Sequence, residues 1–281
     1  MSNNENSQIG LVPGTATSDG KIDVIIDRTG TGGGGSGNKF PWYIFVALAA
    51  VAGLTFLGIQ LVKQLNLKKE IEIKLRTPGE FVYFGHYEQD NDLTNGPEAI
   101  EWLVYDTDGE KSRLVSKYAL DAKAFNERGD SILWADSTIR QWLNNEFLNT
   151  AFTEKEKDMI IKGTVQTADN PINGEPGGPD TEDKIYLLSI DEAQKYFPTE
   201  SDRDIEETPY ARANGSGGYW WLRSAADHEN KYAVHIHNGR GDFCNYSVGL
   251  ITNKDGGVRP VLWLNLNSGV YFKDYHALYD K

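Results

Sequence analysis

The feature that most constrains this chain is an apolar run without any charged residue, which extends from Phe40 to Val62 and contains 23 residues. A helix rises about 1.5 Å per residue, so a run of this length exceeds the hydrocarbon core of a bilayer, which is about 30 Å thick. Trp42 and Tyr43 lie at one end, where aromatic rings favour the membrane interface. The sequence therefore predicts one transmembrane helix at residues 40–62.

The segments around this run divide the rest of the chain. Residues 1–39 are mostly polar and include a glycine-rich stretch, so we predict a disordered tail rather than a cleaved signal peptide. Residues 63–76 are rich in charge and form a juxtamembrane linker that either continues the helix or leads into a strand. Residues 77–281 contain the aromatic patches and the length that a packed core needs, and we expect one globular domain there.

The basic residues near the run give conflicting indications of membrane orientation. Within about fifteen residues of it, two basic residues precede the run and five follow it, which favours a cytoplasmic globular domain. A short tail before a single span and a large domain after it is instead typical of an outward-facing anchor, and large domains cross membranes largely regardless of charge. We expect a single-pass protein of the cell membrane with an extracellular globular domain.

The globular part is strongly acidic. Residues 1–76 contain 8 basic and 6 acidic residues, whereas the remainder contains 20 basic and 35 acidic residues. Nucleic acids require a basic surface, so we exclude nucleic acid as a partner. Cys244 is the only cysteine, and the fold therefore has no intrachain disulfide.

Hydrophobic periodicity in the globular part predicts strands first, then helices, then strands again, which is an α+β order rather than an alternating parallel one. A helix is predicted from a cap at Asp136 or Ser137 through Thr150, and the capping boxes Thr153–Glu156 and Ser189–Glu192 each predict a further helix. The predicted strands are Gly79–Tyr87, Ile100–Asp106, Ser112–Leu120, the segment IYLLS, Gly218–Ser224, Lys231–His237, Ser247–Ile251 and Val258–Leu266.

Several motifs in this order carry a family resemblance. They are FGHYEQDNDLTNG, IEWLVYD, SKYALDAKAFN, IRQWLNNEFLNTAF, DKIYLLSIDEAQKYF, WWLRSA and VRPVLWLNL. Over about residues 78–268 the chain resembles a bacterial domain family of unknown function whose members often lie behind a membrane anchor. That family is similar to the C-type-lectin-like superfamily, which also contains the formylglycine-generating, sulfatase-modifying enzymes. The resemblance implies a compact C-type-lectin-like domain with a twisted antiparallel sheet and a few helices.

The resemblance also implies a variable binding surface between the WWLRS and VRPVLWL strands, at residues 225–257. Loops rich in polar and aromatic side chains suit a glycan or peptide ligand. We expect a cell-surface recognition domain, with a non-catalytic module that docks to envelope proteins as the alternative. The predicted ligand-binding residues are His235, His237, Asn238, Arg240, Asp242, Asn245 and Tyr246, with His228 in the same region.

Enzymatic chemistry has less support. The formylglycine-generating enzymes use a pair of cysteines, and this chain has only Cys244, so that activity is not expected. Cys244 beside His235 and His237 resembles a nucleophile and base, but no third catalytic group is evident. We therefore predict no catalytic residues.

Two patterns in the sequence resemble metal sites. His235 and His237 alternate on one strand and so share a face, but a metal site needs a third ligand, for which Asp242 and His228 are the nearest candidates. The segment Asp90–Gly96 resembles the start of a calcium loop with its glycine one place late, and a turn between strands fits it better. The sequence predicts neither a metal nor a cofactor.

Two arginines lie inside apolar strands, where an unpaired charge is costly. We expect Arg223 and Arg259 each to pair with a buried carboxylate or with backbone carbonyls. The tryptophans Trp102, Trp142, Trp220, Trp221 and Trp263 are expected in the core.

Overall fold

A computed structural model describes residues 41–128, 133–226, 231–244 and 251–267. By its internal contacts the chain divides into two units, residues 1–55 and residues 56–281. The predicted disordered tail, residues 1–39, lies outside the described residues.

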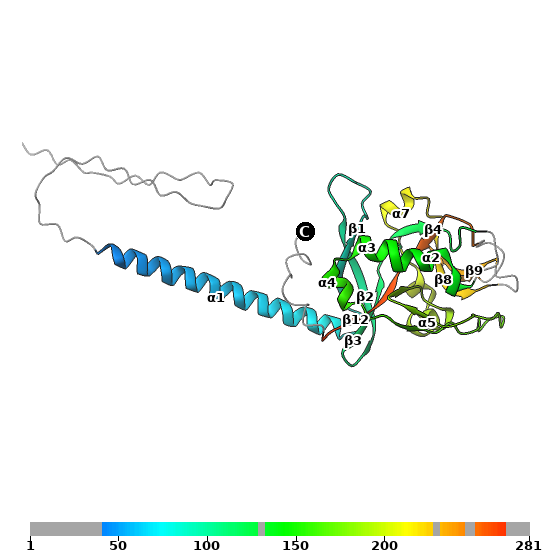
Figure 1. The fold of residues 1–281 in the computed structure, drawn as a ribbon, viewed down its shortest axis with the longest axis horizontal. Coiled ribbons are helices and arrows are strands. Elements are labelled where there is room, and N and C mark those ends of the chain that lie inside the picture. The colour runs from blue at the N-terminus through cyan, green and yellow to red at the C-terminus, as the bar shows by residue number, and fades with distance from the viewer. Residues whose placement is uncertain (1–40, 129–132, 227–230, 245–250, 268–281) are drawn as a thin grey trace, which may run out of the picture. The chain divides into compact units, whose positions relative to one another are not determined.

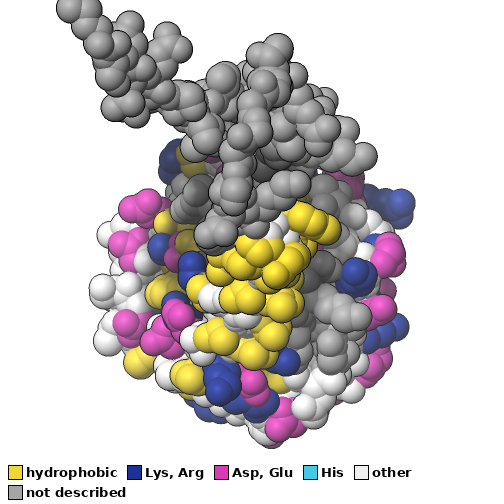
Figure 2. Space-filling model, turned by 90° about the vertical axis from the view of Figure 1, so that its left-hand side faces the viewer, with side chains coloured by type: hydrophobic (Ala, Val, Ile, Leu, Met, Phe, Trp, Pro, Cys, Tyr) yellow, Lys and Arg dark blue, Asp and Glu magenta, His cyan; other side chains and the backbone are white. Residues whose placement is uncertain are grey.

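The first element is a continuous helix, α1 (Trp42–Leu75), drawn blue to cyan in Figure 1. Its first two-thirds carry apolar side chains that are exposed on every side, such as Trp42 and Leu54. Figure 2 views one side of the molecule, on which hydrophobic side chains gather. Most of the exposed large apolar residues that the structure describes belong to α1. This helix is long and apolar enough to cross a membrane, and it could anchor the protein there.

The end of α1 belongs to the globular unit. Of the two alternatives for residues 63–76, the structure has the helix, which continues to Leu75. Ile71 and Leu75 are buried in the main hydrophobic core, and Leu67 packs against it. Ser112 Oγ donates a hydrogen bond to the carbonyl of Leu75. The core therefore includes side chains that precede residue 77.

The first sheet has five strands, and all of its neighbouring strands are antiparallel. The predicted strands at the start and at the end of the globular part meet in it. In spatial order the strands are β1 (Phe81–Tyr87), β2 (Glu98–Asp108), β3 (Lys111–Ser116), β12 (Val261–Asn265) and β7 (Ile185–Tyr186).

The second sheet also has five strands, and it contains one parallel pair, β8 with β11. In spatial order the strands are β10 (Phe243–Cys244), β9 (Ala233–His237), β8 (Tyr219–Ala225), β11 (Gly256–Val258) and β4 (Asp121–Lys123). Gly256 lies so close to the Trp221 ring that a Cβ would fall 1.9 Å from Nε1, so glycine lets these strands pack. The strand predicted at Ser247–Ile251 falls mostly outside the described residues.

Short helices lie between the strands, and α3 packs against β1 while η1 and α5 pack against β8. They are η1 (Trp134–Asp136), α2 (Thr138–Trp142), the π-helical turn η2 (Leu143–Phe147), α3 (Leu148–Ala151), α4 (Glu154–Met159), α5 (Ile190–Tyr196), α6 (Glu200–Arg203) and α7 (Pro209–Ala213). A hairpin of β5 (Gly163–Val165) and β6 (Thr181–Asp183) completes the fold. The predicted cap at Ser137 and both predicted capping boxes are present.

The core explains the order of the elements. Trp102, Trp220 and Trp221 are fully buried, as predicted, whereas Trp142 and Trp263 are half-buried at its margin. Side chains of both five-stranded sheets and of the short helices enter one apolar cluster. The α+β prediction with antiparallel sheets and a few helices is confirmed.

Candidate functional site

Those predicted ligand-binding residues that the structure describes lie on the hairpin of β9 and β10. Its turn, residues 238–241, is held by a hydrogen bond from Gly241 N to His237 O at 2.8 Å. Gly241 has a φ of +66°, and a Cβ there would fall 1.8 Å from the carbonyl oxygen of Glu200. The turn therefore packs directly on the start of α6, and only glycine fits.

The side chains of the turn differ in what they are bonded to. Asn238 Nδ2 donates to Glu207 Oε1 at 3.0 Å, so this amide secures the turn. Asp242 Oδ1 lies 3.1 Å from His237 Nδ1 and 3.5 Å from Arg240 Nε. Arg240 is largely exposed and Asp242 is partly exposed. The hairpin thus presents Arg240 and Asp242 to solvent, while Asn238 supports it.

His235 lies deeper than its neighbours. Only 1% of it is exposed, and its ring packs against Tyr219 and Trp221, at centroid distances of 4.6 and 5.9 Å. Burial, and then the neighbouring His237, lowers the pKa of His235 to about 4, so the imidazole is neutral at physiological pH. Within the described parts of the chain, no hydrogen-bond partner reaches His235 Nδ1.

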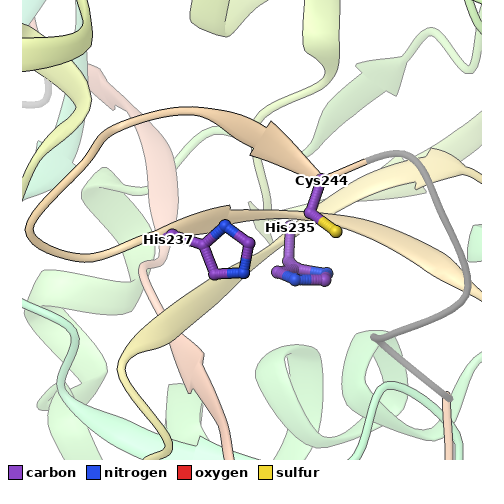
Figure 3. Close-up of side chains that lie close together, drawn as sticks. All are labelled: His235, His237 and Cys244. Atoms are coloured by element: carbon purple, nitrogen blue, oxygen red, sulfur yellow. The ribbon is translucent and has the colours of Figure 1, made fainter.

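Cys244 completes this group. It pairs across the strands with His235, and Figure 3 shows its thiol pointing toward the His235 ring, with His237 beside it. One ligand atom from each of His235, His237 and Cys244 lies within 4.8 Å of the others. The sequence suggested Asp242 or His228 as the third member of the histidine pair. The structure places Asp242 behind His237 instead, while His228, Asn245 and Tyr246 lie outside the described residues.

A separate cleft opens between β5, the start of α5 and the strands that carry Arg113 and Arg223. Its volume is about 300 Å³. Three carboxylates, two arginines and Trp263 line it, together with residues of the β5 hairpin. None of these residues was in the predicted ligand set.

Arg113 forms one wall of the cleft. Its guanidinium carbon lies 4.2 Å from the centre of the Trp263 ring, and Nη1 lies 3.4 Å from Glu192 Oε1. Its Nε is buried, and no hydrogen-bond acceptor among the described residues reaches it. Arg113 therefore combines a fixed position with one unused donor.

Arg223 is more completely bonded. Nη1 donates to Glu192 Oε2 and, at 2.7 Å, to the carbonyl of Leu187. Nη2 and Nε donate to the carbonyl of Gln166 at 2.8 and 3.2 Å. Glu192 Oε2 also accepts the backbone N–H of Ser189 at 3.0 Å, as part of the predicted capping box. One carboxylate thus joins α5, β3 and β8, and the predicted pairing of Arg223 is confirmed.

Arg259 has fewer partners. Its Nε donates to the carbonyl of Ser116 at 3.0 Å, and its guanidinium carbon lies 4.9 Å from the Trp220 ring centre and 5.2 Å from that of Phe197. Among the described residues no acceptor reaches Nη1. The predicted carbonyl contact is present, and burial lowers the pKa of Arg259 to about 9.

The turn after β1 is held mainly by its own side chains. Asp90 accepts from Asp92 N at 2.7 Å and from Asn95 Nδ2 at 2.8 Å, and Asp92 accepts from Thr94. Glu88, Asp90 and Glu98 approach one another, but Asp90 is exposed. The prediction of a turn between two strands is confirmed.

A protein family described as Domain of unknown function (DUF6273) matches residues 109–266, more than half of the chain. The chain belongs to this family. The DUF6273 region contains the hairpin of β9 and β10 and every residue of the cleft named above, whereas α1 and β1 precede it. No curated protein and no solved structure matches the chain.

Sequence reasoning missed the cleft within the DUF6273 region because its walls come from distant segments. Arg113, Glu192 and Trp263 are 79 and 71 positions apart along the chain. The local sequence around each residue predicts only a strand, a helix cap or a core position, and none of these indicates a binding site. The one signal that could have led to the cleft was Glu192, which the capping box places at the start of a helix. No local pattern could show that Glu192 also bonds to Arg223.

Proposed function

We propose that this protein is a membrane-anchored recognition protein whose globular domain binds a glycan or a peptide at the cell surface. The cleft beside Arg113 and Trp263 is the observation that carries the proposal. Its volume of about 300 Å³ lies at the lower end of small-molecule sites and suits one sugar ring or one or two amino-acid residues.

The mixture of charges in the cleft supports this ligand class. Arg113 and Arg223 lie beside Asp183, Asp191 and Glu192, so neither sign of charge dominates. A strongly charged ligand would meet repulsion from one set or the other. Hydroxyl and amide groups both donate and accept hydrogen bonds, so a sugar or a peptide backbone can use the arginines and the carboxylates together.

The resemblance to the C-type-lectin-like superfamily supports the same proposal, and we propose that fold for the two five-stranded sheets. The exposed Arg240 and Asp242 of the hairpin form the second proposed contact region, as the sequence suggested. The apolar α1 supports membrane attachment, and the proposed orientation places the globular domain outside. Protease digestion of intact cells tests the orientation, because an outside domain is cut without permeabilisation.

The binding test uses the full chain in detergent micelles, screened against cell-wall glycans and peptides. We expect at least one ligand to bind, and Thr164→Trp to abolish that binding, because Thr164 is exposed at the cleft and a large ring would fill it. Thr164→Ala is the matched control that leaves the cleft open. Loss with Arg240→Ala but not with Thr164→Trp would move the site to the hairpin. A folded protein that binds no glycan or peptide would overturn the proposal in favour of a protein-docking module.

A further inference from the structure

We propose that His235, His237 and Cys244 form a Zn²⁺ site on the hairpin of β9 and β10. This inference is independent of glycan or peptide binding, and it concerns residues that do not line the cleft. It rests on the register of the hairpin, the spacing of the three side chains, the burial of His235 and the support of His237.

The register brings the three residues to one face. His235 and His237 are two positions apart on β9, so both side chains project from the same side of the sheet. Cys244 of β10 is directly opposite His235 in the antiparallel pair, which places its side chain on that side too. Figure 3 shows the three side chains converging.

The spacing fits a small cation with nitrogen and sulfur ligands. The three ligand atoms lie within 4.8 Å of one another. Zinc binds sulfur at about 2.3 Å and imidazole nitrogen at about 2.0 Å, so ligand atoms around one ion lie within about 4 Å of each other. An inward shift of about 1 Å or less completes the geometry, and three protein ligands leave a fourth position for water or another ligand.

The burial of His235 is a second, independent observation. Its ring is 99% buried, yet Nδ1 has no partner among the described residues. A buried polar atom without a partner costs free energy unless something binds the group. The rings of Tyr219 and Trp221 hold this imidazole in place, so it meets a cation without further loss of side-chain freedom.

His237 has the support that metal-bound histidines have in proteins. Its Nδ1 lies 3.1 Å from Asp242 Oδ1, which leaves Nε2 as the nitrogen for an ion. Asp242 is therefore a positioning residue rather than a ligand. Binding converts the Cys244 thiol to a thiolate, so the bond to zinc replaces the S–H bond and one proton is released to solvent. A nitrogen and sulfur ligand set favours Zn²⁺ over Ca²⁺ and Mg²⁺, which prefer oxygen.

The test titrates the metal-free full chain, in detergent micelles, with Zn²⁺ against a chromophoric chelator, and with Co²⁺ as a spectroscopic probe. We expect one Zn²⁺ per chain and a thiolate-to-cobalt charge-transfer band. Cys244→Ser removes the band, and Cys244→Ser and His237→Gln each weaken Zn²⁺ binding at least about tenfold. Asp242→Asn weakens it about tenfold while the band persists.

His86→Gln is the matched control, because His86 lies on β1 and outside the cluster, and its Zn²⁺ affinity is expected to equal that of the wild type. Thermal melting of each metal-free variant checks that it folds. If Cys244→Ser does not fold, His237→Gln tests the site, because His237 is only half-buried. Absence of Zn²⁺ binding by the wild type, or unchanged affinity in both ligand variants, would overturn the site.

Discussion

Arg223 and Arg259 are both buried, but the groups that surround the two guanidinium groups differ. Around Arg223, one carboxylate and two backbone carbonyls accept hydrogen bonds from all three guanidinium nitrogens. Around Arg259, two aromatic rings and one carbonyl enclose the group, and within the described residues no ion pair forms. The first region uses the charge of its arginine, whereas the second mainly uses its shape and its attraction to ring faces. Burial of an arginine is therefore no measure of how much the fold depends on its charge.

The largest expected effect comes from Arg223→Met, which keeps the length of the side chain and removes its charge. It removes the guanidinium that donates to the carbonyls of Gln166 and Leu187 and to Glu192, which keeps only its contacts with Ser189 N and Arg113. Breaking a buried ion pair from one side costs about 3 kcal/mol or more, and we expect a loss of that size in the free energy of unfolding. Urea unfolding followed by tryptophan fluorescence measures it. A loss no larger than that of Arg259→Met would break the comparison.

Glu192→Gln is expected to have the next largest effect. The amide oxygen still accepts a hydrogen bond from Arg223, but the charge that serves both arginines is gone, and we expect a loss of about 2 kcal/mol. The double variant with Arg223→Met is the sharper measurement. Because the two side chains act together, its loss is expected to be smaller than the two single losses combined. Strictly additive losses would show that the two side chains contribute separately.

Arg259→Met is expected to change the free energy of unfolding by less than about 1 kcal/mol, because an apolar side chain of similar volume removes the cost of burying the charge while it loses the ring contacts. The same urea titration applies. A loss as large as that for Arg223→Met would mean that an unseen counter-charge holds Arg259.

Arg240→Ala is expected to have the smallest effect, within about 0.5 kcal/mol, because two-thirds of its side chain is exposed and its pairing with Asp242 is screened by water. This variant sets the baseline for the other three. A loss above that of Arg259→Met would indicate that the turn depends on its surface pair.

The sequence predicts the local features of this protein well. The apolar run becomes the first part of α1, Ser137 and both capping boxes begin helices, and seven of the predicted strand segments contain strands. Each of these features depends on residues that are close together in the sequence, so the local pattern contains the necessary information. The strand IYLLS is shorter than predicted, because only Ile185 and Tyr186 pair with β12.

Contacts between distant segments could not be predicted in this way. The same reasoning gave Arg223 and Arg259 one expectation, and only the tertiary structure separates them. The pairing of β9 with β10 decides that Cys244, rather than Asp242, lies opposite His235. The cleft forms where β3, α5 and β12 come together, although consecutive members of this set are separated by about seventy residues in the sequence. No periodicity or motif in a single sequence predicts such a long-range contact.

Glu192 has one further consequence, for how the globular unit opens. The first turn of α5, strand β3 of the first sheet and strand β8 of the second all bond to this carboxylate. Unfolding of α5 removes the carboxylate from both arginines, and unfolding of β3 or β8 removes one of its partners. Backbone amides in these elements are therefore expected to exchange with solvent as one cooperative unit, although their sequence positions are far apart.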